Sequence, residues 1–166
     1  MMMLGMVTKT CGTLFLVAIV LVLNAPRIAR ADPSSQARQE IQAVCDRSVL
    51  SYHRRDLNGC MAMYAPVIQS KNVAGRTSYY RQVFAGFASD FAEDPPIPTL
   101  RATVRSVLLH GMTADVVLDW QFTHRHKTFT YVRAYSERAV WVRGSKGWQE
   151  IKGQMTRDAL VYQKNP

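Results

Sequence analysis

The sequence is poor in cysteine and lacks the motifs that most often carry catalytic or cofactor chemistry. Cys11, Cys45 and Cys60 are its only cysteines, and no Cys-x-x-Cys pair occurs. A Gly-rich phosphate loop and a Ser-His-Asp order are also missing. These gaps argue against dithiol redox, nucleotide-dependent and serine-hydrolase activities, and we expect no cofactor.

The basic residues outnumber the acidic ones but form no run. The formal net charge is +9, which favours anionic surfaces or ligands. The lysines and arginines are scattered, however, and no helix-turn-helix or RNA-binding signature occurs. We therefore expect a soluble basic surface and no nucleic-acid partner.

The longest apolar run lies near the start and is too short for a membrane span. It extends from Leu14 to Leu23, about half of the roughly 20 residues that a spanning helix needs. Lys9 precedes it and the small-x-small pair Ala29 and Ala31 follows it, as in a secretory signal. We predict a signal peptide over residues 1–31 and a single secreted or periplasmic domain over 32–166, which has no contact with a membrane after cleavage. The alternative is an uncleaved N-terminal anchor.

Helical periodicity follows the predicted signal. A first helix is expected from about Ser35 to Arg55, with Ser34 or Ser35 as its N-cap. Its apolar face comprises Ile41, Val44, Cys45, Val49 and Tyr52. A second, short helix should begin after Asp56 and end at Pro66, with one side formed by Leu57, Cys60, Met61 and Tyr64.

A third helix is expected after a loop or short strand over residues 67–74. It should start near Thr77 and stop at Pro95–Pro96. Its apolar stripe predicts ordinary core packing rather than a cofactor site, and comprises Tyr80, Val83, Phe84, Phe87, Ala88 and Phe91.

After Pro98 the periodicity changes to two, which is typical of β-strands. Strands are expected at about 99–109, 113–124, 128–143 and 147–162. Both faces of the third strand carry apolar residues, which indicates a bulge or burial on both sides. Helices followed by an antiparallel meander predict an α+β fold, with N-terminal helices packed on a strongly bent antiparallel sheet of about four long strands, a cone-shaped barrel. Such a bent sheet, with helices over its concave side, encloses a pocket.

His124 and His126 raise the question of a metal site, because a strand would place both on one face. Their neighbourhood is polar and basic, and Arg125 and Lys127 would repel a cation. We therefore predict an exposed hairpin tip and no metal.

Cys45 and Cys60 could form a disulfide in an exported protein, but the expected helices separate them. If the first helix runs to Arg55, Cys45 lies about eleven residues before the turn and Cys60 about four after it, a difference in depth of roughly 10 Å. A disulfide needs Cα atoms within about 7 Å. We predict two free, buried thiols.

The segments YHRRDLNGCMAMYAP and RAVWVRGSKGWQEIKG resemble the nuclear transport factor 2-like superfamily, including its SnoaL-like and cystatin-like members. In the family pattern an Asp caps a short helix and an aromatic residue precedes the next loop, and Asp56 and Tyr64 occupy these places. Gly147 and Trp148 match the Gly-Trp that starts the family's last strand. The resemblance implies the fold but hardly the function, since the superfamily includes isomerases, dehydratases, ligand-binding proteins and assembly modules.

Ketosteroid isomerases of this superfamily use an Asp base, a Tyr in the first helix and a protonated Asp on a late strand. Aligned on Asp56 and Tyr64, these positions fall at Asn72, Ser48 and near Arg138. Asn cannot accept a proton at neutral pH, and a cationic Arg is not a neutral acid. The resemblance therefore argues against that mechanism here.

Two groups of residues are candidates for a site in the pocket. Asp119 and Glu137 could act as an acid/base pair, although a cross-strand ion pair with Arg133, Arg138 or Arg143 is the alternative. Aromatic rings with a polar tip suit a mostly apolar ligand that carries hydrogen-bonding groups, and the expected ligand contacts are Tyr52, Tyr64, Tyr80, Trp120, Tyr131 and Tyr135.

Three functions remain open. The first is non-catalytic binding of a small, apolar or amphipathic molecule or of a partner protein. The second is a cofactor-independent SnoaL-like isomerase, dehydratase or hydrolase that uses Asp119 or Glu137 as its base. The third is an assembly module, since superfamily members often dimerise through the sheet, and we expect a homodimer. An acid with a raised pKa at the floor of the pocket would favour the enzyme.

Overall fold

A computed structural model describes residues 32–92, 98–125 and 127–164. Two helices come first, α2 (Pro33–His53) and α3 (Leu57–Met61), followed by two strands, β1 (Tyr64–Lys71) and β2 (Thr77–Tyr79), and then a third helix, α4 (Tyr80–Ala92). Four long strands follow: β3 (Thr99–His110), β4 (Thr113–Arg125), β5 (Phe129–Gly144) and β6 (Gly147–Lys164). The predicted α+β class and the four long strands are confirmed.

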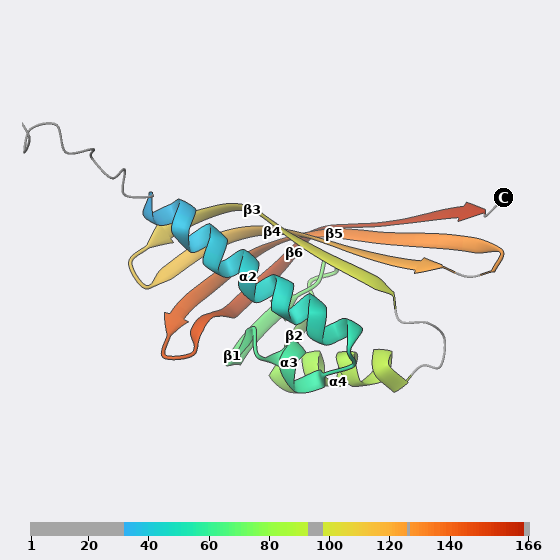
Figure 1. Cartoon of the computed structure of the whole chain (residues 1–166), viewed down its shortest axis with the longest axis horizontal. Coiled ribbons are helices and arrows are strands. Elements are labelled where there is room, and N and C mark those ends of the chain that lie inside the picture. The colour runs from blue at the N-terminus through green and yellow to red at the C-terminus, as the bar shows by residue number, and fades with distance from the viewer. Residues whose placement is uncertain (1–31, 93–97, 126, 165–166) are drawn as a thin grey trace, which may run out of the picture. The chain divides into compact units, whose positions relative to one another are not determined.

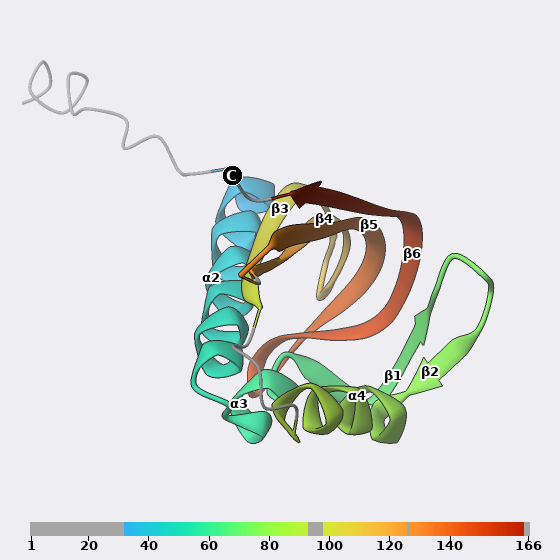
Figure 2. The same cartoon turned by 90° about the vertical axis from the view of Figure 1, so that its right-hand side faces the viewer.

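The six strands form one sheet in the order β2-β1-β6-β5-β4-β3. The chain-adjacent pairs are antiparallel, and β1 pairs with β6 in parallel. The sheet bends strongly without closing, and α2 and α4 lie along its concave side (Figures 1 and 2). The two strands beyond the predicted four are β1, which confirms the short-strand alternative for the segment 67–74 but begins earlier, at Tyr64, and β2, where a helix was expected to start.

The first two helices begin at aspartates. The Asp32 side chain accepts a hydrogen bond from the Ser35 N–H at 3.1 Å, so the cap of α2 is Asp32 rather than the expected Ser34 or Ser35. Asp56 caps α3 as predicted, through the Gly59 N–H. Pro33 is the first helical residue, a position where no N–H is needed. The capping position therefore falls on the residue before it, Asp32.

Two helix boundaries differ from the expectation. Tyr64 starts β1 instead of continuing α3, and Pro66 lies inside that strand. The β1–β6 pairing is interrupted between Tyr64 and Gln69, so a residue without an N–H is tolerated there. Thr77 belongs to the short strand β2, and the third helix begins only at Tyr80. The predicted stop at Pro95–Pro96 lies outside the described residues.

The core lies between α2 and the concave face of the sheet. Trp141, Ile41 and Leu118 are completely buried there. Helix α4 packs more loosely, because none of its residues is fully buried and Phe84, expected in the core, is 39% exposed. Cys45 and Cys60 are free and buried, as predicted.

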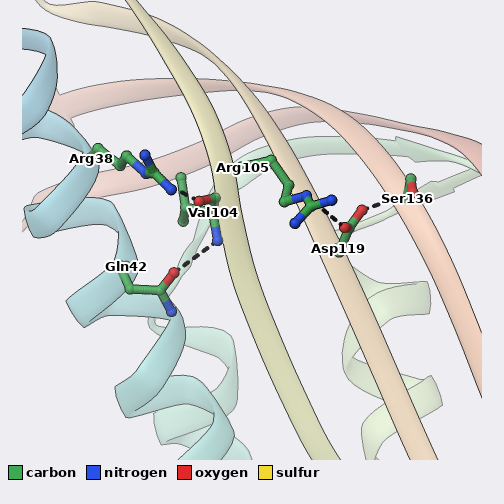
Figure 3. Close-up of polar contacts among 6 residues, drawn as sticks. All are labelled: Arg38, Gln42, Val104, Arg105, Asp119 and Ser136. Atoms are coloured by element: carbon green, nitrogen blue, oxygen red, sulfur yellow. Dashed lines mark hydrogen bonds and ion pairs between the residues drawn. The ribbon is translucent and has the colours of Figure 1, made fainter.

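Helix α2 covers the open edge of β3 with polar side chains. Gln42 accepts from the Val104 N–H at 2.7 Å, and Arg38 donates to the Val104 carbonyl at 3.2 Å (Figure 3). Gln42 also donates to the Ala102 carbonyl at 3.1 Å. Farther along the helix, His53 Nε2 accepts from the Leu100 N–H at 3.0 Å. These contacts satisfy backbone groups that an edge strand otherwise leaves exposed to other chains, and they fix α2 along the sheet.

We expect Gln42→Leu to destabilise the fold. A leucine of similar size cannot form either hydrogen bond, so the partly buried Val104 N–H and Ala102 carbonyl would lose their partner on α2. The expected loss is about 1–3 kcal/mol in the free energy of unfolding. Gln39→Leu, on the exposed side of the same helix, is the control and should change stability by less than about 0.5 kcal/mol. Urea unfolding of the three proteins measures both values, and equal stabilities would show that α2 does not depend on the Gln42 contacts.

Candidate functional site

Two cavities lie between helix α4 and the concave face of the sheet. One has a volume of about 330 Å³ and the other about 230 Å³. Asp90, Tyr135 and Met155 line both cavities, so the two meet along a common wall, and we call them together the cleft. Besides these three, the larger cavity is lined by Tyr52, Pro98, Phe122, His124, Tyr131 and Arg133, and the smaller by Tyr64, Ser70, Val83, Gly86, Phe87 and Glu137.

Four of the six aromatic residues expected at the pocket line this cleft: Tyr52, Tyr64, Tyr131 and Tyr135. Trp120 is buried behind the wall, with its ring stacked on Tyr135 at 6.2 Å between centroids. Tyr80 opens helix α4 and is not among the described residues that line either cavity. The cleft is therefore mainly aromatic, with phenol groups as its polar points.

The hydroxyl groups of the inner tyrosines stay protonated. Burial raises the pKa of Tyr64 and Tyr135 well above the ordinary value, and any negative charge on the neighbouring acids Glu137 and Glu150 raises it further. Neutral phenols can both donate and accept hydrogen bonds. They can therefore orient a polar group of a ligand in either sense.

A charged pair stands at the outer end of the cleft. Arg133 contacts Asp158 through two hydrogen bonds, of 3.0 and 2.8 Å. These bonds lower the pKa of Asp158, whose side chain remains a quarter exposed. Nearer the cleft, the Tyr52 hydroxyl donates to Asp90 at 3.3 Å. The arginine charge is thus matched by a carboxylate within the protein, and the cleft shows no excess of positive charge that would favour an anionic ligand.

Glu137 forms the floor of the smaller cavity. Glu137 is 7% exposed, and its Oε2 accepts a hydrogen bond from Trp120 Nε1 at 3.1 Å. Removal from water raises the pKa of its carboxyl to about 7, although the bond from Trp120 acts in the opposite direction. A carboxyl group that titrates near neutral pH can take up or release a proton at little cost.

A second acid, Glu150, lies beside Glu137 and was not expected from the sequence. It is 1% exposed, and both of its carboxyl oxygens are buried without a hydrogen-bond partner among the described residues. Its backbone N–H donates to the Met63 carbonyl at 2.8 Å, which fixes it at the junction of β6 and β1. Burial, followed by the charge of Glu137, raises the pKa of Glu150 well above the ordinary value.

Irregular pairing of β5 and β6 brings the two acids together. The register shifts between Val140 and Trp141, so that Trp141 pairs with Glu150 and Ala139 pairs with Gly153. Glu150 and Gly153 differ by an odd number of positions and would face opposite sides in a regular strand. The shift turns both of them inward, and this explains why alternation along the sequence gave no sign of Glu150. The extra residues at the two shifts, Ile151 and Thr156, lie in β6, and β5 pairs with β4 without a shift, so the bulge expected as one alternative for the third long strand lies in the fourth instead.

Asp119 is not part of this cluster. It lies on the outer, convex face, where Arg105 contacts it at 3.0 Å and the Ser136 hydroxyl donates to it at 2.8 Å (Figure 3). Its ion-pair partner is thus Arg105, the extra residue in a bulge of β3, rather than one of the three arginines expected. The structure therefore separates the two candidate acids and places only Glu137 in the cleft.

The hairpin predicted at His124 and His126 is confirmed, since β4 ends at Arg125 and β5 begins at Phe129. His124 lies within β4 rather than at an exposed tip, and its ring stacks on Tyr131 with 4.4 Å between centroids. His126 lies outside the described residues. Within the described ranges, no group of three or more His, Cys, Asp or Glu side chains could hold a metal ion.

The three positions compared with the ketosteroid isomerases do not converge on the cleft. Ser48 is buried and its hydroxyl donates to the Cys60 carbonyl. Asn72 follows β1 and organises a turn, where its side chain accepts from the Arg76 N–H. Arg138 lies on the convex face beside Val117. Any chemistry in this cleft thus depends on other residues.

Solved structures with a similar fold include proteins of different roles. One is a nuclear transport factor 2-like protein of unknown function from Shewanella oneidensis MR-1, with 15% identity, coverage of 70% of this chain and 96% of that chain, and a TM-score of 0.60. Another is a ketosteroid isomerase-like protein from Erwinia carotovora atroseptica, with 14% identity, coverage of 74% and 98%, and a TM-score of 0.54. A CaMKII hub from S. rosetta has 19% identity, coverage of 79% and 100%, and a TM-score of 0.58.

No model of a known protein family matches the sequence, and no curated protein matches it. The chain has the nuclear transport factor 2-like fold, which confirms what the resemblance implied about its architecture. At these identities the likeness shows the fold alone.

We expect Glu137 to make the protein less stable as the pH rises. The pKa of Glu137 is about 7 in the folded chain, against an ordinary value of 4.5. Between these pH values the folded state binds a proton that the unfolded state has released, so the free energy of unfolding falls as pH increases. The expected loss between about pH 5 and pH 8 is on the order of 2–3 kcal/mol. Glu137→Gln, which stays neutral at this position, should remove the contribution of Glu137, while the contribution from the raised pKa of Glu150 should remain.

Urea unfolding at several pH values between these limits measures this effect in the wild type and in Glu137→Gln. Asp119→Asn, at a half-exposed acid on the other face, is the control and should leave the pH dependence unchanged. Parallel curves for the wild type and Glu137→Gln would mean that Glu137 is already ionised near its ordinary pKa.

Proposed function

We propose that this protein binds a small, partly apolar molecule in the cleft and exchanges a proton with it through Glu137, as a cofactor-independent isomerase, dehydratase or hydrolase. One observation carries the proposal: an aromatic cleft ends on a buried carboxyl whose pKa is about 7. An acid in this state is typical of a proton-transfer site. Because a structural ion pair would instead lower the pKa of a carboxyl, Glu137 is poorly explained by a purely structural role.

The dimensions of the cleft support a small molecule. Cavities of about 330 and 230 Å³ that share a wall together fall in the range of roughly 300–1,000 Å³ common for small-molecule sites. Aromatic walls contribute apolar contact, and the phenols of Tyr64 and Tyr135 offer hydrogen bonds near Glu137. A molecule with one or two fused rings and one or two polar groups fits this description.

Native mass spectrometry of the protein purified from its own host tests binding. We expect a co-purified small molecule in the wild type and none in Met155→Trp, since Met155 lines both cavities and an indole would fill their common wall. Met112→Trp, at a residue 60% exposed in a turn, is the control and should retain the molecule. Retention by Met155→Trp would place the ligand elsewhere.

Proton transfer is tested on the same molecule in heavy water. The wild type should catalyse incorporation of deuterium into a carbon of the ligand, whereas Glu137→Gln should bind it without this exchange. Binding in the wild type without exchange, without loss of water and without hydrolysis of the molecule would support the second candidate, a non-catalytic ligand carrier. That candidate is favoured by the near-complete burial of Glu137, which leaves little room for water.

We also propose that two copies of the chain associate through the convex face of the sheet. The alternative is that a different protein binds this face. This face carries a hollow of about 490 Å³ whose lining includes the apolar Leu108, Val117 and Val140 beside the cationic Arg138 and Lys152. Leu108 is 59% exposed. A hub protein among the structural neighbours is consistent with assembly on this fold. The subunit count from the native mass spectra tests this proposal.

Export to the periplasm or the medium is a further part of the proposal, with a mature N-terminus at Asp32. Cleavage after Ala31 would leave the Asp32 cap of α2 in place. In the described chain, no helix is long and apolar enough to cross a membrane. N-terminal sequencing of protein from the exported fraction should begin at Asp32, and an intact segment 1–31 would support the uncleaved anchor instead.

A further inference from the structure

The feature that the proposed function leaves unexplained is Glu150, a second buried acid that lines neither cavity of the cleft. Its oxygens receive no hydrogen bond from the described residues, and among those residues no ion pair includes Glu150 or Glu137. Two neighbouring carboxylates that share a site without a cation cannot both ionise. The pair must therefore retain at least one proton over a wide range of pH.

Gly153 shows how closely the two acids approach each other. A Cβ atom added to this glycine would be closer than van der Waals contact to Oε1 of Glu137 and, at 2.6 Å, to Oε1 of Glu150. Both oxygens thus point at the same small space, which exists only because residue 153 has no side chain. The other oxygen of Glu137, Oε2, is taken by the indole of Trp120.

The remaining titratable groups around the pair carry no positive charge. Tyr64 on β1, Tyr135 on β5 and Cys45 on α2 interact with the two acids electrostatically, and Asp90 on α4 lines the same cavity as Glu137. Each of these groups is either neutral or negative. None of them supplies a positive charge that would balance a second carboxylate.

The two acids differ in how well their ionised forms are stabilised, and this difference decides which of them keeps its proton. Glu137 receives the Trp120 N–H, which stabilises its ionised form, and it borders the cleft. Glu150 has neither advantage. Glu137 therefore ionises first, and its charge then makes the ionisation of Glu150 still harder.

We propose that Glu150 is a positioning residue for Glu137: it keeps its proton and shares it across Gly153, so that Glu137 presents a single, oriented carboxylate to a neutral ligand bearing a hydroxyl group. The ligand part of this inference rests on the proposed function. A carboxylate oxygen accepts a hydroxyl hydrogen bond strongly in a dry site, whereas an anionic ligand would meet like charge. The selected class is thus a neutral, ring-containing alcohol or phenol.

Two small probes test the ligand class. Calorimetric titration with 2-naphthol and 2-methoxynaphthalene compares rings of similar size that differ in the hydroxyl hydrogen. We expect 2-naphthol to bind at least about tenfold more tightly at pH 8, a difference of about 1.4 kcal/mol, and to lose this advantage at about pH 5, where Glu137 is protonated. Equal affinities at pH 8 would overturn the selection of a donor group.

Variants at Glu150 test the positioning role in the absence of any ligand. The indole N–H signal of Trp120 in ¹H–¹⁵N NMR reports the ionisation of its partner Glu137 as the pH changes. In Glu150→Gln, a neutral donor of the same shape, the midpoint of this titration should stay within about half a pH unit of the wild type. In Glu150→Leu, which cannot donate, the midpoint should move up by one pH unit or more.

Other outcomes would overturn the inference. A large downward shift in Glu150→Gln would mean that Glu150 carries the negative charge. Unchanged midpoints in both variants would reduce Glu150 to a structural residue. The proposed function fails separately, when Met155→Trp retains the co-purified molecule, and the indole titration does not depend on that result. Circular dichroism of each variant, with Glu150→Gln as the conservative reference, identifies a loss of folding.

Discussion

The offset pairing between β5 and β6 decides which side chains reach the space beneath the helices. A regular strand would place Glu150 and Gly153 on opposite faces, but the register shift beside Trp141 turns both inward. The second shift, beside Glu137, sets Met155 against that residue and so shapes the cleft. Asp119 lies on the outer face by regular alternation, and Arg105, the extra residue in a bulge of β3, contacts it there. The offset in β6 thus brings Glu150 to the same side as Glu137, whereas Asp119 faces outward by regular alternation.

Burying Glu137 and Glu150 together lowers the stability of the fold, and such a cost is typical of a functional site. Two carboxyl groups without a cation lose their hydration and gain one indole hydrogen bond in return. Apolar residues of similar size would fill such a position at lower free energy. Groups that violate the rules of core packing tend to mark functional sites. The location of Glu137 at the end of an aromatic cleft agrees with that view, and the packing of Gly153 shows that the fold makes room for both acids.

The sequence predicts the large elements well, because long strands with alternating character carry a strong signal. β3 to β6 appear within about two residues of their expected limits, and the cap at Asp56 follows from simple hydrogen-bond chemistry. The short elements were harder to predict: β1 was expected as a loop or short strand, and β2 was missed because a few polar residues around Thr77 do not distinguish a three-residue strand from the start of a helix. Glu137 could be named as a candidate, since its type and strand were visible. Glu150 could not, because its face depends on a register shift that emerges only when the strands pair.

The most direct test of this account is a ¹³C NMR titration of the glutamate side-chain carboxyl carbons in the ligand-free protein. The account predicts that the Glu137 signal titrates near pH 7 and that the Glu150 signal still reports a protonated carboxyl after Glu137 has ionised. If both signals instead show ionised carboxylates at about pH 5, the two acids are hydrated and independent, and the buried proton-sharing pair does not exist.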